Sequence, residues 1–343
     1  MKNILVIGTG GTIASSNGSE GLVPVYTPDT LLRFIPEASE RYRIDSIPVL
    51  NLDSTNMQPR HWLEIAGVIR GKYNEYDGFV VTHGTDTLAY TAAMLSYLIQ
   101  NSRKPIVITG SQKPMEAPQT DARKNLLDSI RFAGEASGGV FIVFNGQVIN
   151  GSRAVKVRTK SYNAFESVNY PEVAGIDETG IIRYNPQYAA PRHSGPEHFF
   201  TSIDPRVMLI KLIPGVTPDI FDYIQGKYHG VVVESYGSGG VPFIGDGNLL
   251  AKIEELADSG MIVVITTQCL FEGGNLTLYE VGRRLLRSRI IPAYDMTTEA
   301  AVTKLMWALG RVAEFERVRQ LFLTPVGNDL TVNDPGPAAE TGA

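Results

Sequence analysis

The feature that most constrains the fold is a series of short apolar runs, rich in β-branched residues, that end in glycine or hydroxyl-bearing residues. In the first half of the 343-residue chain they cover residues 4–7, 47–52, 78–81, 105–109 and 140–144. Such runs are typical of strands buried on both faces. Segments with helical spacing separate them, at residues 59–73, 88–100 and 120–135. This order predicts a doubly wound, mostly parallel sheet with helices on both faces.

The second half repeats the alternation on a smaller scale. Its apolar runs lie at residues 207–212, 230–234 and 261–266, and its helical segments at 219–226, 247–259 and 298–309. Residues 185–204 contain three prolines and no periodicity, as expected of a linker. We therefore expect a larger N-terminal α/β domain at residues 1–185, a linker at 186–204, a smaller C-terminal α/β domain at 205–332 and a disordered tail at 333–343.

Composition excludes several classes of function. A net charge of −5 argues against a general nucleic-acid or membrane-surface role, which favours a basic face. No apolar run approaches the roughly 18–20 residues that span a bilayer, and the stretch before Gly8 is too short for a secretory signal. The single cysteine, Cys269, cannot form an internal disulfide. We expect a cytoplasmic protein that binds neither nucleic acid nor membrane.

The first apolar run breaks into Gly8-Thr9-Gly10-Gly11-Thr12. A glycine-rich turn after a strand lets a ligand approach the backbone closely, and sites in open α/β sheets lie at the carboxyl ends of strands. We interpret Thr12 as a nucleophile. The competing interpretation, dinucleotide binding, requires a third glycine where Ile13 stands and an acidic residue about 20 positions on. The third glycine is missing and no acidic residue lies at the end of a clear second strand at that distance, so the fingerprint is incomplete and we expect no cofactor.

Hydroxyl and carboxylate groups follow two further runs, at Asp53-Ser54-Thr55 and at Thr85-Asp86. Because parallel strands end at one edge of a sheet, these groups and Thr12 are expected to converge on a small polar substrate. The amides of Gly10 to Thr12 are candidate oxyanion donors, and Asp86 is a candidate to orient a base. The polar residues 15–21 that follow Thr12 are interpreted as a flexible lid loop.

The base itself is not evident from local spacing. Lys156 is a candidate, since a desolvated lysine activates a hydroxyl in Ser–Lys hydrolases. The segment around it also carries Arg153, Arg158 and Lys160, a pattern equally typical of a solvated surface. The five histidines lack metal-ligand spacing, so no metal site is expected, and His83 is interpreted as a structural hydrogen-bonding group. Cys269 is interpreted as a buried packing residue.

Residues 6–15 (VIGTGGTIAS) and 78–88 (GFVVTHGTDTL) resemble the two signatures of the bacterial-type L-asparaginases in sequence, order and separation. The resemblance extends through DSTNMQP, TGSQKP, NAFESVNYP, YEVGRRLL and DMTTEAAVTKLMWALG, and is greatest to the cytoplasmic type I branch. It implies hydrolysis of L-asparagine to L-aspartate and ammonia without a cofactor. It also implies a homodimer or homotetramer with sites between the N-terminal domain of one subunit and the C-terminal domain of its neighbour.

The resemblance assigns roles to individual residues. Thr12 matches the primary nucleophile, and the second catalytic group matches Thr85, Asp86 and Lys156, in which the lysine activates the threonine and the aspartate also holds the substrate's α-amino group. The loop that binds the α-carboxylate and α-amino ends matches Asp53, Ser54 and Thr55. Ser111 matches a backbone contact near the amide.

Three positions depart from the family pattern. Many relatives place a lid tyrosine where Leu22 stands, which leaves Tyr26, or Tyr279 from a neighbouring subunit, as the assisting phenol. Some type I enzymes bind a regulatory asparagine through an arginine where Glu234 stands, although Cys269 keeps a position associated with that site. Gly240 replaces an asparagine that contacts substrate in several relatives.

The main functional prediction is an L-asparagine amidohydrolase that uses threonine nucleophile chemistry. One alternative is a glutaminase-asparaginase of broader specificity, because one methylene is worth only about 1–3 kcal/mol of discrimination. Another is a non-catalytic amino-acid sensor, which would keep Asp53, Ser54 and Asp86 but has no use for a Thr/Lys pair. The amidase component of a tRNA-dependent amidotransferase shares the motifs but normally carries an extra N-terminal domain, which is not expected here.

Overall fold

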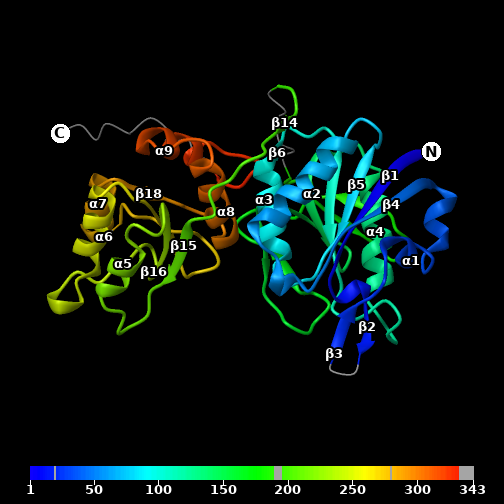
Figure 1. The fold of residues 1–343 in the computed structure, drawn as a ribbon, viewed down its shortest axis with the longest axis horizontal. Coiled ribbons are helices and arrows are strands. Elements are labelled where there is room, and N and C mark those ends of the chain that lie inside the picture. The colour runs from blue at the N-terminus through cyan, green and yellow to red at the C-terminus, as the bar shows by residue number, and fades with distance from the viewer. Residues whose placement is uncertain (19–20, 189–194, 279, 332–343) are drawn as a thin grey trace.

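The computed structural model describes residues 1–18, 21–188, 195–278 and 280–331. Two α/β units lie side by side in Figure 1, and the N-terminal unit is the larger. The strands of an eight-stranded sheet come from residues 2–184, and those of a four-stranded sheet from residues 207–292. The predicted two-domain α/β architecture is therefore confirmed. The predicted tail at 333–343 lies outside the described residues.

The eight-stranded sheet has the order β13-β12-β9-β8-β7-β5-β1-β4. Its parallel part is β4-β1-β5-β7-β8, and β9, β12 and β13 extend it by antiparallel pairing. The strand order reverses at β1, so β4 and β5 flank it. The strands are β1 (Lys2–Gly10), β4 (Tyr42–Leu52), β5 (Gly78–Thr82), β7 (Pro105–Thr109), β8 (Gly139–Phe144), β9 (Gln147–Asn150), β12 (Ala174–Ile176) and β13 (Ile182–Tyr184).

Alternate residues of the central strands face opposite layers of helices, as strand geometry requires. Leu5 and Ile7 of β1 pack in the cluster that contains α2 and α3, whereas Ile4 and Val6 pack in the cluster that contains α1 and α4. The doubly wound prediction is therefore correct. The helices are α1 (Pro28–Leu32), α2 (Pro59–Lys72), α3 (Leu88–Leu98) and α4 (Ala122–Ala133), and single 3₁₀ turns lie at Thr12–Ala14 (η1), Pro36–Glu40 (η2) and Ser54–Asn56 (η3).

The C-terminal sheet is wholly parallel, in the order β15-β16-β17-β18. One of its faces packs on α5, α6 and α7, and the other on α8. Its elements are β15 (Val207–Lys211), α5 (Asp219–Ile224), β16 (Gly230–Ser235), η4 (Gly245–Gly247), α6 (Leu249–Asp258), β17 (Ile262–Thr267), α7 (Glu280–Arg287), β18 (Ile290–Pro292), α8 (Thr298–Leu309) and α9 (Phe315–Leu323).

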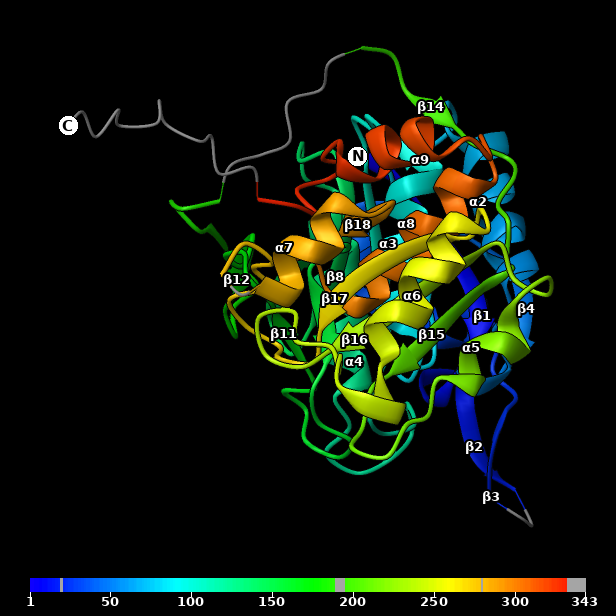
Figure 2. The same cartoon turned by 90° about the vertical axis from the view of Figure 1, so that its left-hand side faces the viewer.

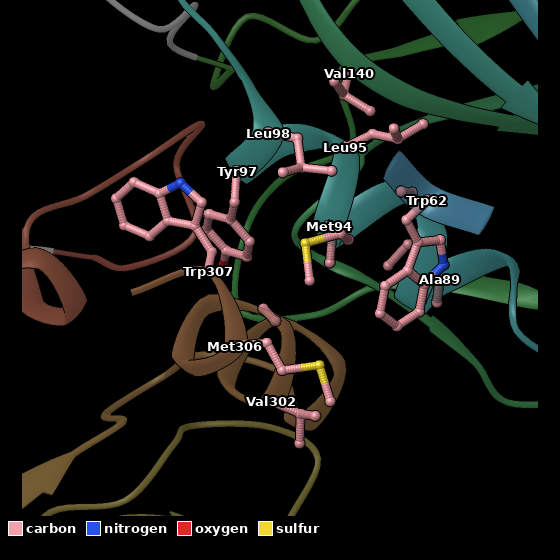
Figure 3. Close-up of a cluster of buried hydrophobic side chains, with 14 of the residues drawn as sticks. Trp62, Ala89, Met94, Leu95, Tyr97, Leu98, Val140, Val302, Met306 and Trp307 are labelled. Atoms are coloured by element: carbon pink, nitrogen blue, oxygen red, sulfur yellow. The ribbon is translucent and has the colours of Figure 1, made fainter. Parts of the chain in front are cut away.

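The two domains share one hydrophobic core, which sequence periodicity did not predict. Helix α3 of the first domain packs against α8 of the second, and a single buried cluster includes side chains of both (Figure 3). The rings of Tyr97 and Trp307 stack with their centroids 6.1 Å apart. Part of the predicted linker also packs on the first domain, because β14 (His198–Phe199) pairs with β6 (Ile99–Gln100). This pairing ends α3 at Leu98, two residues before its expected end.

Two sequence-based expectations are wrong. The stretch at 15–21 is not an irregular loop: β2 (Ser15–Gly18) and β3 (Gly21–Pro24) form an antiparallel hairpin that projects from the first domain (Figures 1 and 2). Ser16 pairs with Val23, and the β-branched Val23 favours the strand. Cys269 is exposed rather than buried, because β17 ends at Thr267 and the cysteine lies in the loop beyond it.

A short antiparallel pair of strands lies apart from both large sheets. It consists of β10 (Ala154–Lys156) and β11 (Phe165–Ser167).

Within the described ranges, no helix combines the length and the apolar character needed to cross a membrane.

Candidate active site

The site forms where the carboxyl ends of β4, β1, β5 and β7 lie side by side. Two glycines let the connecting loops touch. Gly11 has φ +78°, and a Cβ built on it would lie 2.3 Å from the Gly84 nitrogen. A Cβ on Gly84 would lie 2.6 Å from Ser54 Oγ. Only residues without a side chain fit at both points. The loops after β4, β1 and β5 are thereby drawn into one surface, as the sequence predicted for Asp53, Thr12 and Thr85.

A cavity of about 60 Å³ lies at this junction. Its described lining consists of Gly11, Thr12, Ser15, Leu22, Pro24, Asp53, Ser54, Gly84, Thr85 and Asp86. Thr12, on η1, is half-buried, and its hydroxyl has no hydrogen-bond partner among the residues that the structure describes. The hairpin contributes Leu22 and Pro24, so it does border the site as a lid would.

Lys156 does not line the cavity itself but contacts two residues that do. Its Nζ donates to Thr85 Oγ1 at 2.7 Å and pairs with Asp86 Oδ1 at 2.6 Å. The lysine side chain is 16% exposed, whereas Asp86 is 57% exposed and opens towards solvent. Thr85 is 7% exposed. A hydroxyl, an amine that contacts it and a carboxylate that holds the amine are the parts of an activated hydroxyl, its base and the group that orients the base.

The loop after β4 is braced from within and against the loop after β5. Asp53 Oδ1 accepts from the Thr55 backbone amide at 2.9 Å and from its hydroxyl at 3.0 Å. Ser54 Oγ accepts from the backbone amide of Asp86 at 3.2 Å, and Thr87 Oγ1 donates to the Ser54 carbonyl at 2.8 Å. Ser54 and Asp53 reach the cavity, whereas Thr55 lies outside its lining.

His83 fixes the backbone that precedes Thr85. Its Nδ1 lies 2.7 Å from the Gly84 carbonyl, and its Nε2 lies 2.9 Å from Thr91 Oγ1. Thr91 Oγ1 also accepts from Trp62 Nε1 at 2.9 Å. Complete burial lowers the pKa of His83 to about 4. A neutral imidazole that donates from Nδ1 and accepts at Nε2 satisfies both contacts, which agrees with its interpretation as a structural group.

Two expected site residues, Ser111 and Tyr26, do not line this cavity. The Ser111 side chain is buried and donates to the Lys113 carbonyl at 2.5 Å, so only its backbone is free to act as the resemblance implies. Tyr26 lines a separate cavity beside Gly10, and a hydrogen bond with Glu116 raises the pKa of its phenol. Tyr279 lies outside the described residues.

Two further details were not anticipated. Gln112, at the end of β7, accepts from Thr85 Oγ1 at 3.4 Å and is held through its backbone amide by Asp121. Its place in the loop after β7 (Pro105–Thr109) is the sequence signal that could have identified it, since sites in such sheets lie at the carboxyl ends of strands. The Gly11 amide, an expected oxyanion donor, already donates to the Leu52 carbonyl at 2.8 Å, so that expectation is wrong for this group.

No trio of histidine, cysteine or acidic side chains in the described part of the chain is close enough to hold a metal ion. The polar groups that converge here are hydroxyls, carboxylates and one amine. This set suits a small substrate that carries both an uncharged acyl group and an ammonium. A hydroxyl of the site would attack the acyl group, and a carboxylate would bind the ammonium.

Fold and site together define a two-domain α/β protein with a threonine–lysine–aspartate group at the switch point of its larger sheet. The sequence matches the family described as "Asparaginase, N-terminal" over residues 3–189 and "Glutaminase/Asparaginase C-terminal domain" over residues 206–322. The chain belongs to the asparaginase family.

Relatives resemble the chain over nearly its whole length. An L-asparaginase of Thermococcus kodakarensis is 40% identical over 331 residues, which are 96% of this chain and 99% of the relative. A component of the glutamyl-tRNA(Gln) amidotransferase of Pyrococcus abyssi is 34% identical and is matched over 77% of its length and 96% of this chain.

Solved structures show the same likeness. The thermostable L-asparaginase of Thermococcus kodakarensis superposes with a TM-score of 0.89 at 39% identity, covering 96% of this chain and 99% of that one. L-asparaginase I of Vibrio cholerae gives 0.84 at 28% identity with the same coverage. A probable cytoplasmic L-asparaginase of Campylobacter jejuni gives 0.80 at 25% identity, covering 94% of this chain and 99% of that one.

Proposed function

We propose that this protein hydrolyses the side-chain amide of L-asparagine to L-aspartate and ammonia through a threonine nucleophile. The observation that carries the proposal is the Lys156 amine, 2.7 Å from Thr85 Oγ1 and 2.6 Å from Asp86, beside a cavity that Thr12 also lines. A hydroxyl is a weak nucleophile until a positioned base removes its proton. Family membership and the L-asparaginase of Thermococcus kodakarensis support the same substrate.

The reaction needs one acyl transfer and one hydrolysis. Thr12 Oγ1 adds to the amide carbon, its proton passes to the amide nitrogen, and ammonia leaves to give an ester on Thr12. Water then adds to the ester, aspartate leaves and the threonine hydroxyl is restored. Thr85 and Lys156 carry protons between these groups, and Asp86 holds the lysine. The balance is one water consumed and one ammonia released.

The charged ends of the substrate have complementary partners at the cavity. We assign the α-ammonium to Asp53 and Asp86, since both carboxylates line the cavity. We assign the α-carboxylate to the hydroxyl of Ser54 and to the loop of Thr55. A backbone group of Ser111 is assigned to the amide end, as the family resemblance implies.

The cavity favours L-asparagine over L-glutamine. Its volume is about 60 Å³, and Leu22 and Pro24 of the hairpin close one side. The additional methylene of L-glutamine must displace Leu22 and Pro24, or shift the reacting amide away from the threonine hydroxyl. Discrimination by one methylene amounts to about 10–200-fold in kcat/KM, and we expect L-asparagine to be preferred within that range.

Ammonia release from L-asparagine and L-glutamine tests the proposal. We expect turnover with L-asparagine, and a loss of at least about 10²-fold in kcat for Thr12→Ala and for Thr85→Ala. Thr179→Ala is the matched control, because this threonine lies in an exposed turn, bonded to Asp177. Full activity in both site variants would contradict the assigned roles. Calorimetric binding of L-asparagine by the wild type without turnover would instead indicate a sensor.

We also propose a homodimer or homotetramer. The family resemblance implies this assembly, and the described lining of the cavity comes entirely from residues 11–86, with no described residue of this chain's C-terminal domain in it. The C-terminal domain carries exposed apolar side chains on its loops, among them Phe243, Ile244 and Phe271. Light scattering after size-exclusion chromatography is expected to give a dimer or tetramer, and a fully active monomer would contradict this arrangement.

For the chain's organisation, we keep the division into an N-terminal catalytic domain at residues 1–185, a linker at 186–204 and a C-terminal domain at 205–332. We propose a cytoplasmic location. The single cysteine requires no oxidising compartment, and the Campylobacter jejuni structure is described as a probable cytoplasmic enzyme. Fractionation of cells expressing the chain with its native N-terminus tests this, and recovery in an extracytoplasmic fraction would contradict it.

A further inference from the structure

Lys156 does not lie on a strand of the large sheet. Its strand, β10, has three residues and pairs only with β11, outside the eight-stranded sheet that carries Thr12 and Thr85. Contacts elsewhere must therefore hold the lysine amine within 2.7 Å of Thr85 Oγ1.

Arg153, the residue immediately before β10, is the largest fully buried side chain of the described residues. Nε donates to the Asn328 carbonyl at 2.6 Å, and Nη1 to the carbonyl and Oδ2 of Asp295 at 2.9 and 3.0 Å. Nη2 donates to Thr331 Oγ1 at 3.1 Å. Because guanidinium is a planar fork, these acceptors on two of its edges fix its position and orientation.

The acceptors belong to two segments distant in sequence. Asp295 lies in the turn between β18 and α8, and the others lie on the C-terminal strap, residues 324–331. The residue next to Arg153 contributes as well, since Ser152 Oγ donates to the Gly327 carbonyl at 3.0 Å. Thr331 and Asp295 are joined directly, through the Thr331 amide and Asp295 Oδ1 at 3.0 Å.

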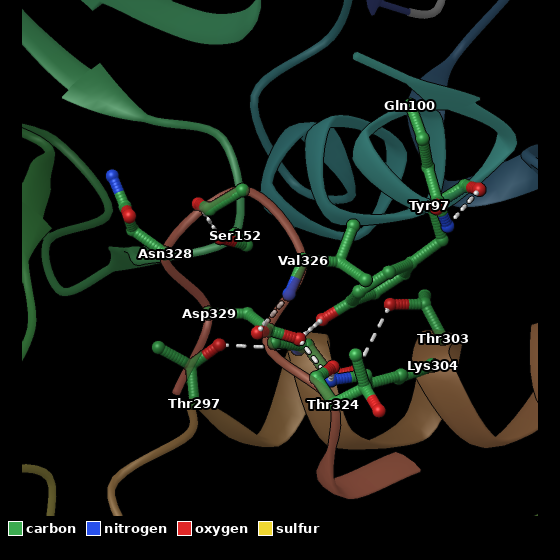
Figure 4. Close-up of polar contacts among 12 residues, drawn as sticks. Tyr97, Gln100, Ser152, Thr297, Thr303, Lys304, Thr324, Val326, Asn328 and Asp329 are labelled. Carbon is green, nitrogen blue, oxygen red and sulfur yellow. Dashed lines mark hydrogen bonds and ion pairs between the residues drawn. The ribbon is translucent and has the colours of Figure 1, made fainter. Parts of the chain in front are cut away.

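The C-terminal strap is itself anchored inside the protein (Figure 4). Asp329, fully buried, pairs with Lys304 Nζ of α8 at 2.7 Å and accepts from Tyr97 Oη of α3 at 2.9 Å. Lys304 Nζ also donates to the Thr324 carbonyl at 2.8 Å. The strap is thus fixed to a helix of each domain, and Arg153 couples β10 to this fixed point.

We propose that Arg153 is a positioning residue for catalysis: its buried guanidinium couples β10 to the C-terminal strap and thereby holds Lys156 against Thr85 and Asp86. This proposal rests on the proposed function, in which Lys156 moves protons. A stabilising role alone does not explain the arrangement well, because a buried ion pair often adds no net stability over an apolar substitute. Misplacement of a reacting group by about 1 Å, in contrast, costs up to about 10²-fold in rate.

Arg153→Lys is the principal test. The lysine keeps the positive charge, but its single amine cannot reach the acceptors that lie on two edges of the guanidinium. We expect kcat for L-asparagine to fall at least 10-fold while KM changes less than threefold, since the binding groups Asp53, Ser54 and Asp86 follow β4 and β5 and none of them contacts Arg153. Thr331→Val removes one acceptor at nearly constant volume, and a smaller fall in kcat is expected. Val263→Ala, in the separate C-terminal core, is the control for lost stability, with kcat retained.

The outcomes separate this proposal from a structural role and from the proposed function. If Arg153→Lys and Val263→Ala lower the melting temperature alike and both keep kcat, or if Arg153→Lys changes only KM, the positioning role is wrong. If Arg153→Lys does not fold, an unchanged kcat in Thr331→Val overturns the proposal. Should the wild type release no ammonia, the proposed function fails. A crystal structure of either variant then decides on positioning, with a Lys156 Nζ to Thr85 Oγ1 distance above 3.5 Å expected and an unchanged distance contradicting it.

Discussion

Acidification should destabilise this protein through His83 in particular. Burial lowers the pKa of its imidazole in the folded chain to about 4, against about 6.5 in an unfolded chain. As pH falls below about 6.5, the unfolded chain takes up a proton that the folded chain refuses until about pH 4. The free energy of unfolding therefore decreases through this window.

The magnitude follows from the two pKa values. At about 1.4 kcal/mol for each pH unit, the full effect of His83 is about 3 kcal/mol below pH 4, of which about 2.5 kcal/mol is lost by pH 4.5. The two ring nitrogens of His83 contact the Gly84 carbonyl and the Thr91 hydroxyl. The side chain is fully buried, so water does not solvate the charge of the protonated ring. A non-titrating amide at this position is expected to lack this part of the pH dependence.

Urea unfolding of the wild type and of His83→Gln, at pH 7.5, 6.5, 5.5 and 4.5 and equal protein concentration, measures the effect. The substitution lowers stability at pH 7.5 by lost packing, but the informative quantity is how the difference between the two proteins changes. We expect the wild-type advantage to shrink by about 2.5 kcal/mol between pH 7.5 and pH 4.5. Parallel curves for the two proteins would refute the reasoning, since other titrating groups are common to both.

Two further substitutions test buried charges. Burial, followed by the charge of Glu234, raises the pKa of Glu299 to about 7, so the stability that the protonated carboxyl contributes is present at low pH and lost as pH rises through 7. In urea unfolding, Glu299→Gln is expected to be more stable than the wild type by about 2–3 kcal/mol at pH 8.5, and within about 1 kcal/mol of it at pH 5; a constant difference would contradict this. Lys304→Met leaves Asp329 buried without its cation and is expected to cost about 3–5 kcal/mol of unfolding free energy at pH 7. Adding Asp329→Leu should recover at least half of that loss, and a double variant no more stable than the single one would show that the pair is not the cause.

The central strands were predictable because their information is local. The run at 105–109 (PIVIT) is apolar up to its last residue and lies between Lys104 and Gly110, and β7 has those same bounds. The convergence of Thr12, Asp53 and Thr85 followed from the general geometry of parallel strand ends. Helix α8 was also located by its spacing, at Thr298–Leu309. Its packing against α3 was not predicted, because periodicity identifies an apolar face but not the surface that covers it.

The basic segment around β10 shows where sequence reasoning fails. Four cations lie within eight residues, and a solvated surface was a reasonable interpretation. In the structure Arg153 is fully buried and Lys156 is 16% exposed, whereas Arg158 is 42% exposed. The acceptors that make burial of Arg153 favourable lie more than 140 residues away in the chain, and no local pattern reveals them. Family resemblance, rather than spacing, identified Lys156.

The most direct test of the account is the activity of Lys156→Met, measured together with L-aspartate binding. We expect the variant to bind L-aspartate within about threefold of the wild type, because the binding groups Asp53, Ser54 and Asp86 all remain and Asp86, 57% exposed, stays solvated without the lysine. Its kcat for ammonia release from L-asparagine should fall by about 10²–10⁴-fold. A variant that keeps wild-type kcat would contradict the claim that the lysine activates a threonine of this site.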